Sequence, residues 1–98
     1  MKKESGVPFP LGPSRFNEGI NFAIVSEKEP VLEILEPESL TVELEKTGNV
    51  YHIWLPLKKC VYRYKIGKEK LVDPYAPIIE NTYKKYEPIG KFDPVAFD

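Results

Sequence analysis

The sequence has few of the residues that characterise metal-binding, redox-active or phosphate-binding proteins. It contains one cysteine, Cys60, and one histidine, His52, and its six glycines are isolated from one another. A single thiol excludes an internal disulfide and favours a reducing compartment, so Cys60 is best explained as a small buried apolar residue. A lone histidine without cysteine or carboxylate at ligand spacing predicts no metal site. Isolated glycines exclude a phosphate-cradling loop, and no other cofactor motif is present.

A dominant charge and a long apolar run are also missing. Fourteen Lys and Arg balance fifteen Asp and Glu, for a formal net charge of −1. Such a chain has no basic field with which to attract nucleic acid or an anionic membrane. No segment approaches the roughly 18 apolar residues of a membrane span, and the opening MKKESGVPFP lacks the apolar stretch of a secretory signal. We therefore expect a cytoplasmic globular chain without a nucleic-acid or membrane partner.

The sequence does contain short alternating segments that are typical of β-strands. The segments are residues 19–25, 31–35, 40–45, 50–55, 61–66 and 71–72, with residues 78–79 as a final edge strand. Ten prolines and no sustained helical period argue against long helices. We predict one all-β domain, an antiparallel sandwich of about seven short strands over residues 6–80. Residues 1–5 form a flexible N-terminus in this interpretation, and residues 81–98 form an irregular linker.

Residues 50–55 and 61–66 are the most apolar of these segments. Five residues containing Pro56 join them, which predicts an antiparallel hairpin. Alternation places His52 and Trp54 on the outer face of the first strand, where Arg63 becomes their cross-strand neighbour. This outer face is too apolar to stay bare, so it must be covered by the same domain, another protein or a ligand.

The inward positions of the strands predict the core. It should contain Ile20, Phe22, Ile24, Leu40, Val42, Leu44, Tyr51, Ile53, Leu55, Tyr62, Tyr64 and Ile66. The acidic residues instead occupy outward or turn positions, where strands normally carry solvated charge. A nucleophile elbow is also absent, so we expect no catalysis from this chain alone.

Five motifs occur in one order along the chain. They are PFPLG (residues 8–12), GINFAIVS (19–26), TGNVYHIWLP (47–56), YRYKI (62–66) and DPYA (73–76). Their order and spacing resemble the N-terminal domain of isoamylase-type glycogen debranching enzymes, a family-48 carbohydrate-binding module. The resemblance implies an immunoglobulin-like sandwich that precedes the catalytic (β/α)-barrel of a family-13 glycoside hydrolase. The family's catalytic nucleophile and acid lie on that barrel and have no counterpart here.

The resemblance implies two possible functions. In the first, the domain is non-catalytic and packs on the barrel of a glycogen- or starch-debranching α-1,6-glucosidase, with Trp54, Tyr75, Phe9 and Leu11 at the contact. Tyr75 has a second interpretation, in which its ring locks its own turn onto the sheet edge. In the alternative function, the domain binds α-glucan autonomously.

The alternative places the sugar on Trp54, His52 and Arg63. Members of the family that grip glucan use two tryptophan platforms. At the place of the first platform this sequence has a loop of acids and prolines with Ser39. At the place of the second it has Lys70. The missing platforms favour the first function.

Overall fold

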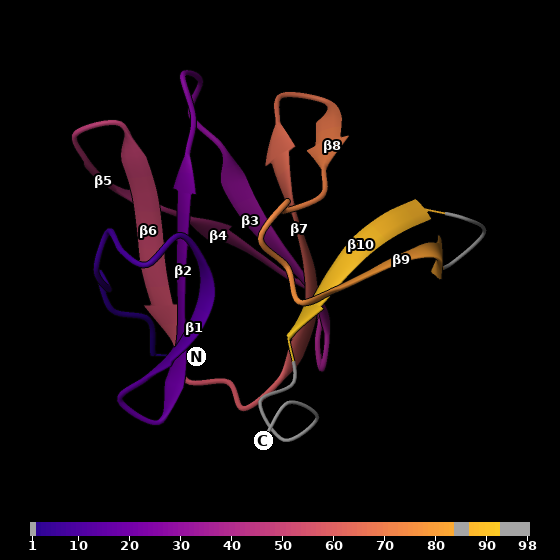
Figure 1. The fold of residues 1–98 in the computed structure, drawn as a ribbon, viewed down its shortest axis with the longest axis horizontal. Helices are drawn as coiled ribbons and strands as arrows, with labels where there is room; N and C mark the ends of the chain where they lie inside the picture. Colours follow the sequence, from indigo (N-terminus) through magenta and orange to yellow (C-terminus); the bar gives the residue numbers. More distant parts are fainter. Residues whose placement is uncertain (1, 84–86, 93–98) are drawn as a thin grey trace.

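Ten β-strands and no helix make up residues 2–83 and 87–92, which the computed structural model describes (Figure 1). In chain order the strands are β1 (Gly12–Phe16), β2 (Gly19–Val25), β3 (Val31–Glu36), β4 (Leu40–Glu43), β5 (Glu45–Thr47), β6 (Val50–Leu55), β7 (Cys60–Ile66), β8 (Glu69–Leu71), β9 (Ile78–Tyr83) and β10 (Glu87–Phe92). All their pairings are antiparallel.

The strands form two sheets with the topology of an immunoglobulin domain. The first sheet has the order β1-β2-β6-β5, which corresponds to strands A-B-E-D of that fold. The second has the order β4-β3-β7-β10-β9, with β8 also paired to β7, and its first four strands correspond to C′-C-F-G. The predicted all-β sandwich is confirmed, with ten described strands in place of about seven.

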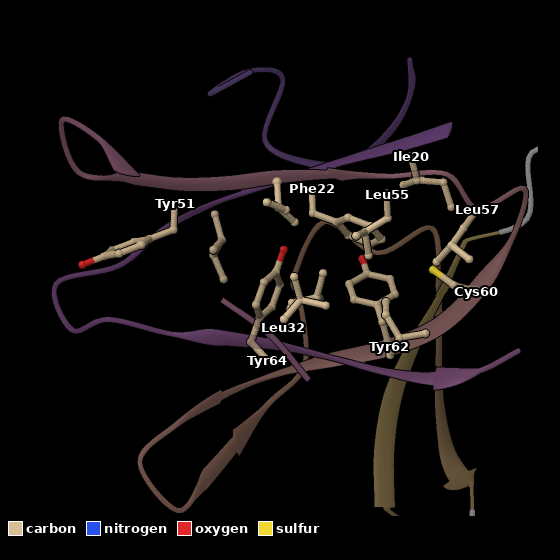
Figure 2. Close-up of a cluster of buried hydrophobic side chains, with 13 residues drawn as sticks. Ile20, Phe22, Leu32, Tyr51, Leu55, Leu57, Cys60, Tyr62 and Tyr64 are labelled. Atoms are coloured by element: carbon tan, nitrogen blue, oxygen red, sulfur yellow. The ribbon is translucent and has the colours of Figure 1, made fainter. Parts of the chain in front are cut away.

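The core fills the space between the two sheets (Figure 2). Tyr62, Tyr64 and Phe22 are its largest fully buried side chains. Their rings meet edge to face, with centroids 5.1 Å apart for Phe22 and Tyr62 and 6.1 Å apart for Tyr62 and Tyr64. Such aromatic pairs add about 0.5–1.5 kcal/mol each to the gain from burial.

Most of the predicted core residues are buried in this cluster. Leu40 and Leu44 are partly buried against it, and Ile66 is half-buried. The cluster also contains four residues that the predicted core omits, namely Leu32, Ile34, Leu57 and Cys60. Cys60 thus has the small apolar role predicted for it.

The predicted hairpin of residues 50–66 is wrong. β6 pairs with β2 and β5, whereas β7 pairs with β3, β8 and β10, so the two strands belong to different sheets. Residues 56–59 carry the chain across the open end of the sandwich (Figure 1). Leu57 in this connection is 7% exposed, whereas a hairpin turn would leave it in solvent. The apolar faces of β6 and β7 therefore meet across the core and not edge to edge.

The predicted strand over residues 40–45 is two strands in different sheets. β4 ends at Glu43, and β5 begins at Glu45 on the other side of the sandwich. Leu44 lies between them and is partly buried against the core. Because Leu44 faces the core where the chain changes sheets, Leu40, Val42 and Leu44 alternate as they would in one continuous strand. The sequence pattern therefore does not show the change of sheet.

The chain ends also differ from the prediction. No strand is predicted before residue 19, but β1 lies there, and it tolerates Pro13 because it is an edge strand. Asn17 and Glu18 join it to β2 with φ values of 47° and 61°, as in a two-residue type I′ turn. At the other end, β9 and β10 occupy half of the predicted linker. The remainder of that linker, residues 84–86 and 93–98, lies outside the described residues.

Candidate functional site

His52 lies on the outer face of the first sheet, where the beginning of the chain covers it. Its Nδ1 lies 2.6 Å from the main-chain oxygen of Ser5, and its Nε2 lies 2.8 Å from Oγ1 of Thr47. Because a carbonyl oxygen can only accept, Nδ1 carries a hydrogen in this arrangement. The residue is 4% exposed and both ring nitrogens are engaged. His52 therefore has no nitrogen available for a ligand or for proton transfer.

Residues 4–7, hereafter the N-terminal strap, lie beside β6 and then cross toward β1 (Figure 1). Glu4 pairs with Trp54 through both main-chain groups, with N···O distances of 3.0 and 2.8 Å. Trp54 needs this partner because β5 pairs with β6 only from Val50 to His52. Glu4 thus fills the place in the ladder that the chain vacates when it changes sheets at Leu44. Glu4 and Ser5 are ordered by these contacts, although they fall in the predicted flexible N-terminus.

Asn21 holds the far end of the strap. Its side chain accepts a hydrogen bond from the Val7 amide at 2.8 Å and donates one to the Val7 carbonyl at 2.9 Å. Asn21 is fully buried, so its amide group acts as a neighbouring strand would. Gly6 passes so close that a Cβ would lie 2.3 Å from Asn21 Oδ1 and 2.9 Å from the Ile53 carbonyl carbon. With a φ of +71° as well, this position requires glycine.

Trp54 is half-buried beneath the hairpin of β1 and β2. Its indole N–H donates to the main-chain oxygen of Phe16 at 2.5 Å. A Cβ on Gly19 would lie 2.5 Å from two atoms of the indole ring, so the ring rests directly on that glycine. The cover predicted for this outer face is therefore supplied by the same domain.

Arg63 does not join His52 and Trp54, because β7 lies in the other sheet. Its cross-strand neighbour is Glu33 on β3, and Arg63 Nε lies 2.7 Å from Glu33 Oε1. The prediction of an outer cluster that includes Arg63 is wrong for the same reason as the predicted hairpin.

Asp73 fixes the turn that follows β8. Its carboxylate accepts hydrogen bonds from the Tyr62 hydroxyl at 2.8 Å and from the Tyr75 amide at 2.9 Å. The Ala76 amide also donates to the Asp73 main-chain oxygen. Burial raises the pKa of the Asp73 carboxyl, and the two donors oppose part of that shift. Burial and the nearby Asp73 raise the pKa of Tyr62 well above its ordinary value, so its hydroxyl remains a donor.

The Asp73 turn meets the start of β1. A Cβ on Gly12 would lie 2.5 Å from Tyr75 Cβ, so the two chain segments touch at this glycine. Tyr75 is 55% exposed and Phe9 is 73% exposed, while Leu11 is half-buried. We call Phe9 and Tyr75 the aromatic surface. Of the four predicted contact residues, Phe9, Leu11 and Tyr75 thus belong to two segments that meet, whereas Trp54 packs under the β1–β2 hairpin.

Two reactive groups lie in the core without a visible chemical role. Burial raises the pKa of the Cys60 thiol to about 12, which keeps it protonated and unreactive. The Tyr64 hydroxyl is buried, and no described residue forms a hydrogen bond with it. Burial raises its pKa as well, so it does not ionise.

Residues 2–83 and 87–92 contain no group of three or more His, Cys, Asp or Glu side chains placed to hold a metal ion. Within the same ranges, no helix has the length and apolar character needed to cross a membrane. Comparison of the sequence with protein-family models and with curated proteins finds no match.

Sequence reasoning missed the residues that hold the outer face together. In the predicted strand over residues 19–25, Gly19 is only the first residue, and Asn21 is given no role. The one available signal was a polar amide between Ile20 and Phe22 in a strand that is otherwise apolar on both faces. A residue of this kind is buried only when its hydrogen bonds are satisfied, so it indicates that a neighbouring segment must supply partners.

Proposed function

We propose that this chain is a non-catalytic accessory domain of a glycogen- or starch-debranching α-1,6-glucosidase. It packs on the catalytic (β/α)-barrel and helps to shape the α-glucan site. The class rests on the resemblance of the five sequence motifs. The observation that carries the proposed mode of action is the contact of Gly12 with Tyr75, which joins the first and last motifs at the aromatic surface.

The aromatic surface has the character of a contact site between domains. Exposed aromatic side chains are enriched among the residues that dominate binding energy at interfaces. Asp73 holds the turn rigid through Tyr62, a fully buried residue of β7, so Tyr75 is presented from a fixed position. A preorganised aromatic side chain loses little conformational entropy when a partner covers it.

Autonomous glucan binding finds less support in the same geometry. A sugar platform needs an open aromatic face with free hydrogen-bond donors beside it. The Trp54 ring rests on Gly19 and its N–H is engaged, and both nitrogens of His52 are engaged by Ser5 and Thr47. Arg63 is on the other sheet, so these residues do not form one open surface.

The proposal can be tested with an isoamylase-type enzyme from which its own N-terminal domain has been removed. We expect the chain to bind this truncated enzyme saturably in calorimetry, and Tyr75→Ser to weaken the binding about tenfold or more. Phe16→Ser is the matched control, because Phe16 is also an exposed aromatic residue, 40% exposed, and lies at the opposite end of β1 from Gly12. Absence of binding, or equal binding by both variants, would contradict the proposal.

A sugar titration separates the two functions. We expect maltoheptaose and β-cyclodextrin at up to several millimolar to cause no saturable change in Trp54 fluorescence or in backbone amide shifts. A saturable response centred on Trp54 and His52 would instead establish the autonomous glucan-binding module.

A further inference from the structure

The N-terminal strap is hydrogen-bonded to three residues of β2 and β6. Its partners are the main chain of Trp54, the imidazole of His52 and the side-chain amide of Asn21, which together we call the strap seat. Residues 8–11 connect the strap to β1 and are here called the hinge. Pro8 and Pro10 within the hinge have no amide hydrogen to donate, so the hinge cannot join a ladder at these positions.

The strap seat requires a glycine at one place in the strap. The Asn21 amide of the seat and the adjoining Ile53 main chain would clash with any side chain at the place of Gly6. The same place needs a φ of +71°, which few residues other than glycine adopt. An extended segment therefore fits only if a glycine stands two residues after the one that pairs with Trp54.

From this geometry we infer that the strap of a second copy can occupy the strap seat, so that two chains form a strand-exchanged dimer. Exchange replaces every contact of the strap with an identical one from the other copy, and a closed two-fold dimer leaves no seat empty. The balance between monomer and dimer then depends on the hinge, which sets the effective concentration of the strap near its own seat. Short flexible connections give effective concentrations in the millimolar range.

Phe9 favours a second copy over an unrelated peptide. It lies in the hinge and is 73% exposed in the single chain, the largest exposure among the apolar side chains noted above. In an exchanged dimer both hinges pass between the copies, where the two Phe9 rings can cover each other. This inference does not rest on the proposed function. Phe9 also belongs to the aromatic surface, which the proposed function assigns to the contact with the barrel. The exchanged dimer is therefore expected for the chain when no barrel is bound.

The test varies the length of the hinge in the full chain. Deleting residues 10 and 11 shortens the reach by about 7 Å, which keeps the strap from its own seat. We expect light scattering to show that this variant dimerises at concentrations about 100-fold lower than the parent chain, whose dissociation constant should be on the order of 1 mM. Inserting Gly-Ser-Gly-Ser after Pro10 is the matched control and should remain a monomer. A folded, shortened variant that stays monomeric would overturn the inference.

Glycine substitutions show which surface makes the dimer. In the shortened chain, Gly6→Ala should abolish dimerisation because the strap no longer fits any seat. Gly48→Ala should leave it intact, since Gly48 has a comparable φ of +61° but open space at its Cβ. A dimer that persists with Gly6→Ala would use another surface and would refute exchange.

A measurement on the unaltered chain covers the case in which the shortened chain fails to fold. A millimolar mixture of nitrogen-15 and carbon-13 labelled chains, refolded together, should give contacts between Glu4 of one copy and Trp54 of the other. Absence of such contacts would overturn the inference.

Discussion

Replacing Gly19 with alanine should displace the indole ring of Trp54. An added Cβ would lie 2.5 Å from Trp54 Cε2 and Cζ2 and 2.4 Å from the Leu55 carbonyl oxygen. Non-bonded carbon atoms settle at about 3.5–4.0 Å. Both the ring and the adjoining backbone must therefore move by about an ångström, which breaks the geometry of the bond from the indole N–H to Phe16.

The cost can be worked from these contacts. Overpacking of this kind costs about 1–3 kcal/mol, and the lost hydrogen bond costs about 1 kcal/mol more. Alanine restricts the unfolded chain, which offsets about 0.4–1 kcal/mol. We expect the free energy of unfolding to fall by about 2 kcal/mol. For a domain of this size the Tm should fall by about 8–16 °C.

Urea unfolding followed by fluorescence measures both effects, because Trp54 is the chain's single tryptophan. Gly19→Ala should lower the midpoint and shift the emission of the folded state. Gly48→Ala should leave that emission unchanged, because it adds backbone strain without touching the ring. A change in stability of less than about 0.5 kcal/mol together with unaltered emission would show that the alanine does not displace the ring.

Two further substitutions test the buried polar groups. The pKa of Asp73 is raised on folding from its ordinary value of 3.8, so its contribution to stability is greatest below that pH and is lost as pH rises through the folded value. Asp73→Asn has no carboxyl to ionise, so its free energy of unfolding should rise relative to that of the parent chain as pH increases from 4 to 7 in urea unfolding. An identical pH dependence of the two proteins would contradict a raised pKa of Asp73. Tyr64→Phe removes a buried hydroxyl with no described partner and should raise the free energy of unfolding by about 1 kcal/mol in the same assay; a clear loss of stability would show that the hydroxyl has a partner.

The sequence predicted the face of each strand better than it predicted the neighbours of the strand. Alternation correctly turned Tyr51 and Tyr62 inward, because burial on one face of a strand is a local property with a period of two. It could not assign β6 and β7 to different sheets, because a short connection containing Pro56 is compatible with a hairpin and with a crossover. Leu57 was the available sign, since an apolar residue in a solvent-exposed turn is unfavourable.

The outer face of the first sheet was less accessible to prediction. That His52 and Trp54 need cover follows from composition, but their hydrogen-bond partners in the covering segments are 47 residues away for His52 and 38 residues away for Trp54. Nothing local in the first residues of the sequence indicates that Glu4 pairs with Trp54. The edge of β6 at Trp54 lacks a partner from β5 only because the chain changes sheets at Leu44. Long-range partners of this kind follow from topology and not from periodicity.

The pairing of Glu4 with Trp54 has a consequence for the order of folding. Residues 4–7 are synthesised before their partner in β6, so the strap must dock late and over a long loop. Few bonds hold it, which places it among the elements that open most easily in the native state. The amide hydrogen of Trp54 is bonded to Glu4 and not to β2. It should therefore exchange with solvent whenever the strap opens. Amides deeper in the sheet should exchange only when the whole domain unfolds. One amide near the end of β6 thus reports on the docking of residues 4–7.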